Sequence, residues 1–337
     1  MNPASTIRPV SLIRPPALKE GDRVAVLCVS SPVDPDALNA GLDALRFAGL
    51  EPVTYPSAHD PGTMRPYLAG DDAMRAGDLR AALTEPGIAG ILFARGGSGA
   101  QRTLEAMDWD GIGPDTGLQP KVLAGYSDIT AVLEAVAVKL GWASVFGPMV
   151  AIREGASHYS FGSLLRTLMR PDRATEIRYP RAVTVVPGVA RGVTTGGTIS
   201  LIASSLGTGT SRPARGGILL VEEVDEEDYR VDRMLTQLRR SGYLDGVAGI
   251  VAGSFTGCGP PEMIQDILTE RLGDLNVPMI ACQRRSRRPV PGLPLRRRGR
   301  TRRHHRHPAP ARPAPHLDPR IRAASPACIR RGHSGPP

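Results

Sequence analysis

The sequence predicts an α/β protein with an N-terminal parallel-sheet α/β domain and a smaller β-rich C-terminal domain. Three observations lead to this prediction. Apolar, strand-like runs alternate with helix-like segments up to about residue 147. The chain has 337 residues, a length typical of about two domains. From residue 193 the composition shifts toward Gly, Ser and Thr, and a new strand–helix–strand pattern follows.

In the first half of the chain, each predicted strand is a short apolar run that leads into a turn. These runs are DRVAVLCVSSP (22–32), EPVTYP (51–56), GILFARGG (90–97) and PKVLAGYS (120–127). The predicted helices cover residues 35–47, 71–83 and 129–140. Functional loops of such sheets follow the carboxyl ends of the strands, which is where ARGGSG and GYSDIT stand.

The predicted domain plan has five parts. Residues 1–15 form a flexible N-terminus, 16–150 the first domain, 151–190 a connecting region, 191–283 the second domain and 284–337 a tail. Residues 217–255 show the pattern of strand, acidic turn, helix and strand. The tail lacks periodicity and aromatic residues and holds eleven of the 32 prolines, so we predict that it is disordered.

The basic charge of the chain comes from the tail alone. Residues 284–337 hold sixteen Arg and one Asp, which is +15, whereas the whole chain is +9; residues 1–283 therefore carry −6. A basic segment without aromatic residues for base stacking does not favour nucleic-acid binding. We find no apolar run of membrane-spanning length, no signal peptide and no metal-like cysteine spacing. We therefore expect a cytoplasmic protein without membrane association, metal or cofactor.

The segment GYSDIT (125–130) places Ser127 between an apolar run and a helix-like segment. A serine in a sharp strand-to-helix turn is lifted out of the sheet, and the next backbone N–H, that of Asp128, can donate to an oxyanion. Gly125 permits the tight approach of the chain. The pattern differs from the GxSxG of α/β-hydrolases, because Ile129 replaces the second glycine. A helix N-cap serine is the alternative interpretation of Ser127.

Longer motifs extend this interpretation. They are YLAGDDAMRAGDLRAAL (67–83), ILFARGGSGAQRTLEAMDW (91–109), VLAGYSDIT (122–130), FGPMV (146–150), GGTISLIASSLGT (196–208) and the segment 218–255. In this order they closely resemble the LD-carboxypeptidase family, over about residues 15–281. The members of that family include muramoyltetrapeptide carboxypeptidases and microcin C self-immunity peptidases.

The resemblance implies a metal-free, usually dimeric serine peptidase with a Ser–Glu–His triad between an α/β and a smaller β-rich domain. Such enzymes cleave the amide before a C-terminal D-residue in a small peptide or muropeptide, such as the D-alanine of murein tetrapeptide. By position, Ser127 matches the nucleophile, and Asp128 and Gly97 match the backbone oxyanion donors. Glu222 matches the triad acid, and Thr198 stands where the family usually has Asn.

Strand periodicity leaves the choice between Glu222 and Glu223 open, because adjacent side chains of a strand face opposite ways. The resemblance selects Glu222, and a pair of solvated charges is the alternative. Arg95 and Arg102 are candidates for holding the anionic end of the substrate. A surface or ion-pair role is the alternative for both arginines.

The triad histidine has no counterpart in this chain. The family carries it in a GHG segment soon after the strand that matches VPMIA (277–281), where this chain reads ACQRRSRRPVPGLPLRRRG. Residues 1–283 contain only His59 and His158, and both precede Glu222 instead of following it. With suitable codons, a one-base shift turns QRRSRRPVPGLP into SVGHGGRFQAY. We therefore predict a frameshift, real or a sequencing error, near codons 281–283.

The resemblance to this family leaves two alternative functions open. One is a catalytically inactive relative that lacks the base and only binds such peptides. The other is a microcin-type hydrolase of peptidyl-nucleotide amides. The residues that line the substrate pocket decide between these substrates, and the sequence motifs do not identify them.

Overall fold

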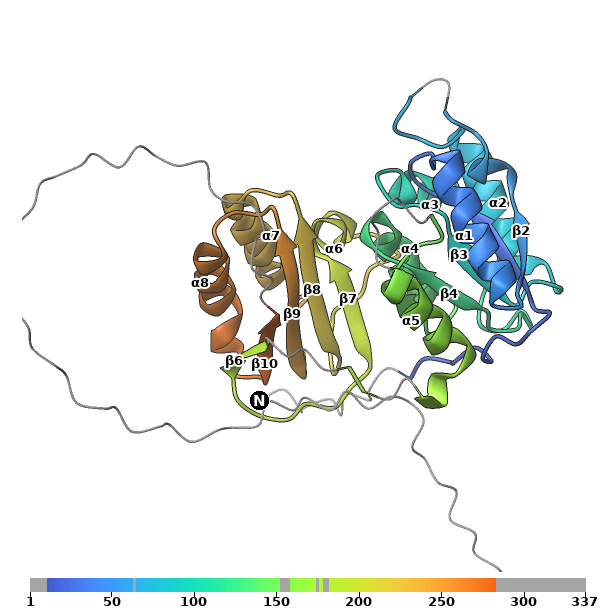
Figure 1. The fold of residues 1–337 in the computed structure, drawn as a ribbon. Helices are drawn as coiled ribbons and strands as arrows, with labels where there is room; N and C mark the ends of the chain where they lie inside the picture. Colours follow the sequence, from blue (N-terminus) through green and yellow to red (C-terminus); the bar gives the residue numbers. More distant parts are fainter. Residues whose placement is uncertain (1–10, 63–64, 152–157, 174–175, 178–181, 283–337) are drawn as a thin grey trace, which may run out of the picture.

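The computed structural model describes residues 11–62, 65–151, 158–173, 176–177 and 182–282. Two α/β domains, each built on a five-stranded sheet, lie side by side (Figure 1). The predicted tail and most of the predicted flexible N-terminus lie outside the described residues. Among the described residues, no helix has the length and apolarity that a membrane crossing requires.

The first sheet is parallel throughout, with the strand order β2-β1-β3-β4-β5. Its strands are β1 (Arg23–Leu27), β2 (Glu51–Thr54), β3 (Gly90–Phe93), β4 (Val122–Gly125) and β5 (Val145–Phe146). The strand order reverses direction at β1 and β3, and ligands of open α/β sheets bind at the carboxyl ends beside such a switch point. The loops that follow β1, β3 and β4 therefore meet where a ligand is expected.

Helices cover both faces of this sheet. The helices α1 (Pro35–Phe47) and α5 (His158–Met169) pack on one face, and α2 (Asp72–Thr84), α3 (Ala100–Ala106) and α4 (Thr130–Lys139) on the other. Side chains of β1 alternate between these two cores, so that Val24 and Val26 face α1 while Ala25 and Leu27 face α2. Burial on both faces explains the continuous apolar runs in the sequence.

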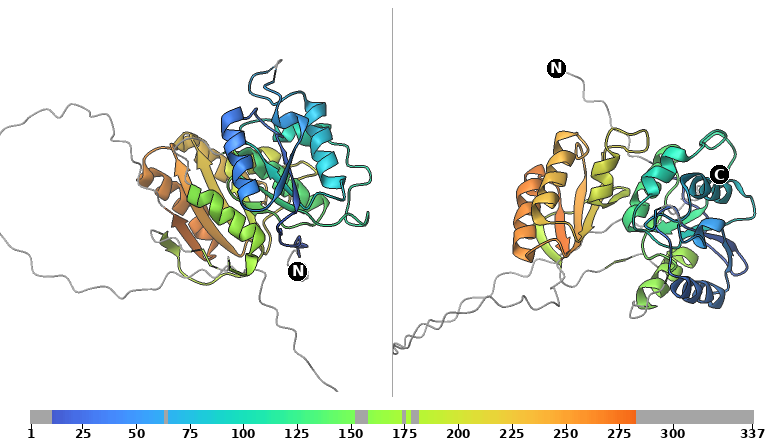
Figure 2. Two further views of the ribbon diagram at one scale, coloured as in Figure 1. Left: turned by 45° about the vertical axis from the view of Figure 1, so that its right-hand side comes forward. Right: turned by 90° about the horizontal axis from the view of Figure 1, so that it is seen from above.

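The second sheet has the order β6-β10-β9-β8-β7, with β6 antiparallel and the other pairs parallel. Its strands are β6 (Ala182–Val186), β7 (Thr194–Thr198), β8 (Ile218–Val224), β9 (Gly249–Thr256) and β10 (Met279–Cys282). The helices α6 (Ile199–Ser205), α7 (Asp228–Arg240) and α8 (Pro261–Leu272) share one core with a single face of this sheet (Figure 2). On the opposite face Leu220 and Val251 are half-buried.

Short 3-10 turns complete the description: η1 (Pro56–Ala58), η2 (Ser127–Ile129), η3 (Pro171–Arg173) and η4 (Gly273–Leu275). The predicted fold class is confirmed, and the predicted strands and helices of the first domain are present within a few residues of their expected ends. The helices α3, α5, α6 and α8 and the strands β5, β6 and β7 were not predicted. The connecting region contributes to both domains, because α5 packs on the first sheet and β6 joins the second.

Candidate active site

Ser127 stands at a sharp turn just after the carboxyl end of β4. Its φ is +61°, in the left-handed region that a residue with a side chain seldom occupies, and its side chain is half-exposed. Gly125 makes the turn possible, because a Cβ at this position would lie 2.8 Å from Cγ2 of Ile129. Strain of this kind costs about 1–3 kcal/mol and is concentrated at functional sites.

The helix N-cap interpretation of Ser127 is wrong. The N-cap of α4 is Ile129, and no side chain caps either this helix or the η2 turn that precedes it. The serine therefore occupies its strained position without a capping contact that would explain it.

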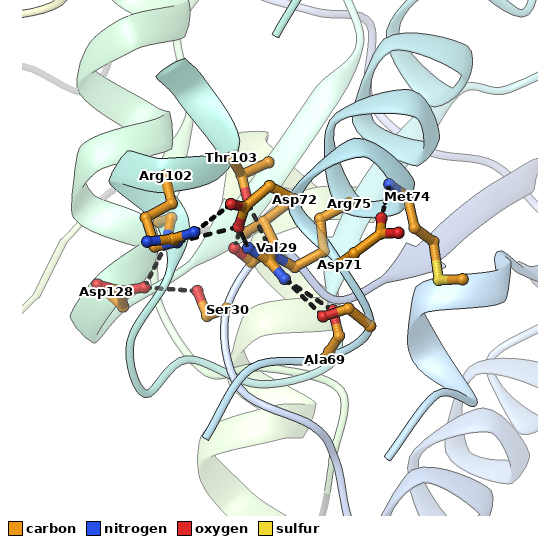
Figure 3. Close-up of polar contacts among 12 residues, drawn as sticks. Val29, Ser30, Ala69, Asp71, Asp72, Met74, Arg75, Arg102, Thr103 and Asp128 are labelled. Atoms are coloured by element: carbon orange, nitrogen blue, oxygen red, sulfur yellow. Dashed lines mark hydrogen bonds and ion pairs between the residues drawn. The ribbon is translucent and has the colours of Figure 1, made fainter. Parts of the chain in front are cut away.

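The side chain of Asp128 ties the Ser127 turn to the loops that follow β1 and β3 (Figure 3). Its Oδ2 atom accepts hydrogen bonds from Ser30 Oγ at 2.6 Å and from the backbone N–H of Ala100 at 2.8 Å. Asp128 is 5% exposed, and burial raises the pKa of its carboxyl group, although the bonds from Ser30 and Ala100 oppose the rise. Ser30 was not predicted as a site residue; its signal in the sequence is its position three residues after the buried strand β1.

The glycine loop after β3 passes directly against the serine. A Cβ at Gly96 would lie 3.3 Å from Cβ of Ser127. Gly97 has a φ of +111°, and a Cβ there would lie 2.1 Å from Ser31 Oγ, so a side chain does not fit. The hydroxyl of Ser31 also accepts from the backbone N–H of Ser98 at 3.1 Å. Gly97 and Asp128 line one cavity, so the structure brings the two predicted oxyanion donors together.

Glu222 approaches this turn from the second domain. Thr198 Oγ1 donates to Glu222 Oε1 at 2.5 Å, and the backbone N–H of Thr198 donates to Thr130 Oγ1 at 3.2 Å. Thr130 is the first residue of α4, three positions after Ser127. Through Thr198, hydrogen bonds thus connect Glu222 to α4, the helix that begins three residues after Ser127. Glu222 is 9% exposed, and burial raises the pKa of its carboxyl group, whereas the bond from Thr198 lowers it.

Glu223 points to the other side of β8. Its Oε2 accepts from the backbone N–H of Ser200 at 2.8 Å, and its Oε1 accepts from that of Val224 at 3.0 Å. Its 3% exposure and the 9% exposure of Glu222 show that the alternative of a solvated charge pair is wrong. The two neighbouring carboxylates therefore have different surroundings, and Glu222 is the one that bonds to Thr198, the residue whose backbone N–H donates to Thr130 of α4.

The two candidate arginines also differ in their surroundings. Arg95 donates through Nη1 to the carbonyl oxygen of Pro32 at 2.6 Å. Arg102 forms an ion pair with Asp72 and lines a cavity of about 260 Å³ between the domains. The structure therefore brings Arg102, but not Arg95, to the cavity that Gly97 and Asp128 share.

No histidine is placed to serve as the base of Ser127 among the described side chains. His59, the single histidine whose side chain the structure describes, is exposed and follows η1 beyond β2. Three strand spacings, about 14 Å, separate β2 from β4. The side chain of His158 and residues 283–337 lie outside the described residues. Likewise, no group of three or more His, Cys, Asp or Glu in the described part is placed to hold a metal ion.

Comparison with known proteins agrees with this architecture. Residues 24–147 match the LD-carboxypeptidase N-terminal domain, and residues 191–284 match the LD-carboxypeptidase C-terminal domain. A Streptomyces coelicolor protein with a provisional carboxypeptidase name is 45% identical over 270 residues, 80% of this chain and 86% of that protein. The murein tetrapeptide carboxypeptidase of Pseudomonas aeruginosa is 30% identical over 275 residues, 76% of this chain and 85% of that protein.

Solved structures show the same fold. A muramoyltetrapeptide carboxypeptidase from Oxalobacter formigenes superimposes with a TM-score of 0.61 at 26% identity, covering 77% of this chain and 87% of that one. An MccF-like protein from Bacillus anthracis has a TM-score of 0.68 at 23% identity and covers 80% and 89%. The two domains, in this order, are those of a family of carboxypeptidases. The chain belongs to the LD-carboxypeptidase family.

Proposed function

We propose that this protein is a serine LD-carboxypeptidase that releases a C-terminal D-amino acid, such as the D-alanine of murein tetrapeptide. The observation that carries the proposal is the strained Ser127 at the carboxyl edge of the first sheet, connected through Thr130 and Thr198 to the buried Glu222. A nucleophile from one domain and an acid from the other are the two triad members that this chain supplies.

In this proposal Ser127 Oγ attacks the scissile carbonyl carbon. The backbone N–H groups of Gly97 and Asp128 stabilise the oxyanion that forms, and a histidine oriented by Glu222 takes the proton of the serine. The same histidine protonates the leaving amine of the D-amino acid, which departs from an acyl-enzyme. A water molecule then hydrolyses this ester and regenerates Ser127.

We propose murein tetrapeptide as the substrate because relatives at 30% identity or above have names that refer to murein peptides. The likeness to MccF proteins is below 25% identity and supports the fold alone. The test is incubation of the chain with its frame shifted by one base after codon 282, which supplies the histidine, with murein tetrapeptides that end in D-alanine or in L-alanine. Release of D-alanine only, and its loss in Ser127→Ala, is the expected result; release of neither residue contradicts the proposal.

The missing base leads to a second proposal, a change of reading frame near codons 281–283. It is supported by the match to the C-terminal family domain, which ends at residue 284, where the Arg- and Pro-rich composition begins. A second support is the face of β8 and β9 that the helices do not cover, where Leu220 and Val251 remain half-buried. Resequencing codons 275–300 from source DNA tests the frame directly.

The outcome decides between two functions. If one base is gained or lost and GHG appears, the protein has its general base and D-alanine release is expected. If the frame stands, the chain is an inactive relative, since a serine hydroxyl is a weak nucleophile when no base accepts its proton.

A further inference from the structure

The cavity between the domains has one wall from each domain. Ser98, Gln101 and Arg102 contribute to the first wall, and Ser200 and Ser204 of α6 to the second. The side chain of Gln101 crosses between the walls, because its Nε2 donates to Ser204 Oγ at 2.9 Å. Six of the nine residues that line the cavity have polar side chains, and Arg102 is the one cation on its walls among the described residues.

Arg102 is held by a carboxylate that a second, buried arginine fixes (Figure 3). Asp72 accepts from Arg102 Nε at 3.0 Å and also from Arg102 Nη2. The same carboxylate pairs with Arg75, which is fully buried and also donates to Thr103 Oγ1 and to the carbonyl oxygen of Ala69. The position of Arg102 is therefore set by α2 and by a buried network, although 46% of its side chain is exposed.

This arrangement leaves donors free for a ligand. A guanidinium carries five N–H groups, and the bonds to Asp72 use the N–H of Nε and one N–H of Nη2. Three N–H groups of Arg102 thus have no partner among the described residues. Planar pairs of such donors match the geometry of a carboxylate.

We infer that Arg102 binds the free carboxylate of the substrate's C-terminal residue, and that Asp72 and Arg75 are positioning residues for it. The inference rests on the proposed peptidase function and assigns one part of the site.

Distance along the substrate supports this assignment. A carboxypeptidase cleaves one residue before the free carboxylate, and consecutive Cα atoms are about 3.8 Å apart. The carboxylate must therefore be bound close to the oxyanion donors. Gly97 and Asp128 line the same cavity as Arg102, and the backbone N–H of Ala100, two residues before Arg102, bonds to Asp128.

The carboxylates near the cavity already have hydrogen-bond or ion-pair partners. Asp72 is shared between two arginines, and the Oδ2 atom of Asp128 is occupied by Ser30 and Ala100. Arg95, the other candidate, donates to Pro32 and is not on the cavity wall, so it serves as a comparison.

The test is a binding cycle in the full-length chain with Ser127→Ala, which removes turnover. Calorimetry measures the binding of murein tetrapeptide ending in D-alanine and of the same peptide with a C-terminal carboxamide. We expect the acid to bind at least about tenfold more tightly than the amide, which corresponds to about 1.4 kcal/mol. Arg102→Ala should reduce this preference to less than about twofold, and Arg102→Lys and Asp72→Asn to intermediate values.

The matched controls are Arg95→Ala and Arg80→Ala. Each removes one positive charge at a position that does not line the cavity, and each should keep the full preference for the acid over the amide. Retention of the preference for the acid in Arg102→Ala, or its loss in Arg95→Ala, overturns the inference while the proposed function stands. If neither peptide binds to the parent chain, the proposed substrate class is wrong and the inference is overturned with it. Thermal unfolding of each variant confirms that the chain remains folded.

Discussion

The hydroxyl of Thr198 donates a 2.5 Å hydrogen bond to Glu222 Oε1, across the neighbouring strands β7 and β8. The backbone N–H of the same threonine donates to Thr130 in the first domain. Thr198 therefore contacts both the candidate triad acid and the helix behind Ser127. Its place is one where the family usually has Asn, another side chain able to donate a hydrogen bond.

Replacement of Thr198 by Val should destabilise the protein by about 1.5–3 kcal/mol at pH 8, because the buried carboxylate of Glu222 loses a donor. Thr198→Ser keeps the hydroxyl and should be nearly neutral. The measurement is chemical unfolding of both variants at pH 8 and at pH 4. An equal loss of stability in the two variants would show that the hydroxyl is not the cause.

Glu222→Gln should stabilise the protein at alkaline pH. Burial raises the pKa of Glu222, so the folded protein holds this proton more tightly than the unfolded chain does. The stability that the bound proton contributes is complete below the ordinary carboxyl pKa and is lost as pH rises through the raised pKa. Glutamine stays neutral at every pH and avoids this loss. We expect the melting temperature at pH 8 to rise by roughly 2–4 °C, the effect of about 1 kcal/mol, and the difference to shrink toward pH 4. A destabilised variant at pH 8 would contradict this prediction.

Strain at Ser127 predicts an order of stability among its variants. Ser127→Gly should be more stable than the wild type by roughly 1 kcal/mol, because glycine adopts a φ near +61° without a steric cost. Ser127→Ala keeps the Cβ and should stay close to the wild type. Urea unfolding of the three proteins separates the cases; if the glycine variant is the least stable, the turn is not strained as described.

Asp128→Ala should be strongly destabilising. It leaves the buried Ser30 hydroxyl and the N–H of Ala100 without an acceptor, at about 1–3 kcal/mol for each donor. Ser30→Ala removes one of the two bonds and should lose less. Hydrogen exchange at the Ala100 amide is the specific measurement, since this amide should lose protection in Asp128→Ala and keep it in Ser30→Ala.

Much of the fold follows from the sequence because parallel strands buried on both faces are continuous apolar runs with turn residues at their ends. The strand β5 was missed because two residues give no pattern, and α3 because its N-cap, Gly99, provides no capping side chain. The helix α8 begins at Pro261, the second of two adjacent prolines, and a proline in the first turn is a sequence signal for a helix start.

For the site, sequence reasoning identified the residues with recognisable motifs but not those that act through space. The contact of Thr198 with Glu222 joins residues 24 positions apart, and that of Ser30 with Asp128 joins residues 98 apart. Such pairs depend on the order of strands in the sheet, which short motifs do not encode. For the same reason the sequence does not distinguish Arg95 from Arg102, of which only Arg102 lines the cavity.

The most direct measurement of the central claim, that Ser127 is a peptidase nucleophile whose base is missing from this reading frame, is D-alanine release from murein tetrapeptide by two full-length chains. One has the present reading frame, and the other has the frame shifted by one base after codon 282. We predict Ser127-dependent release by the shifted chain and a rate about 10⁴-fold lower for the present chain. Equal rates for the two chains, or release that survives Ser127→Ala, would contradict the claim.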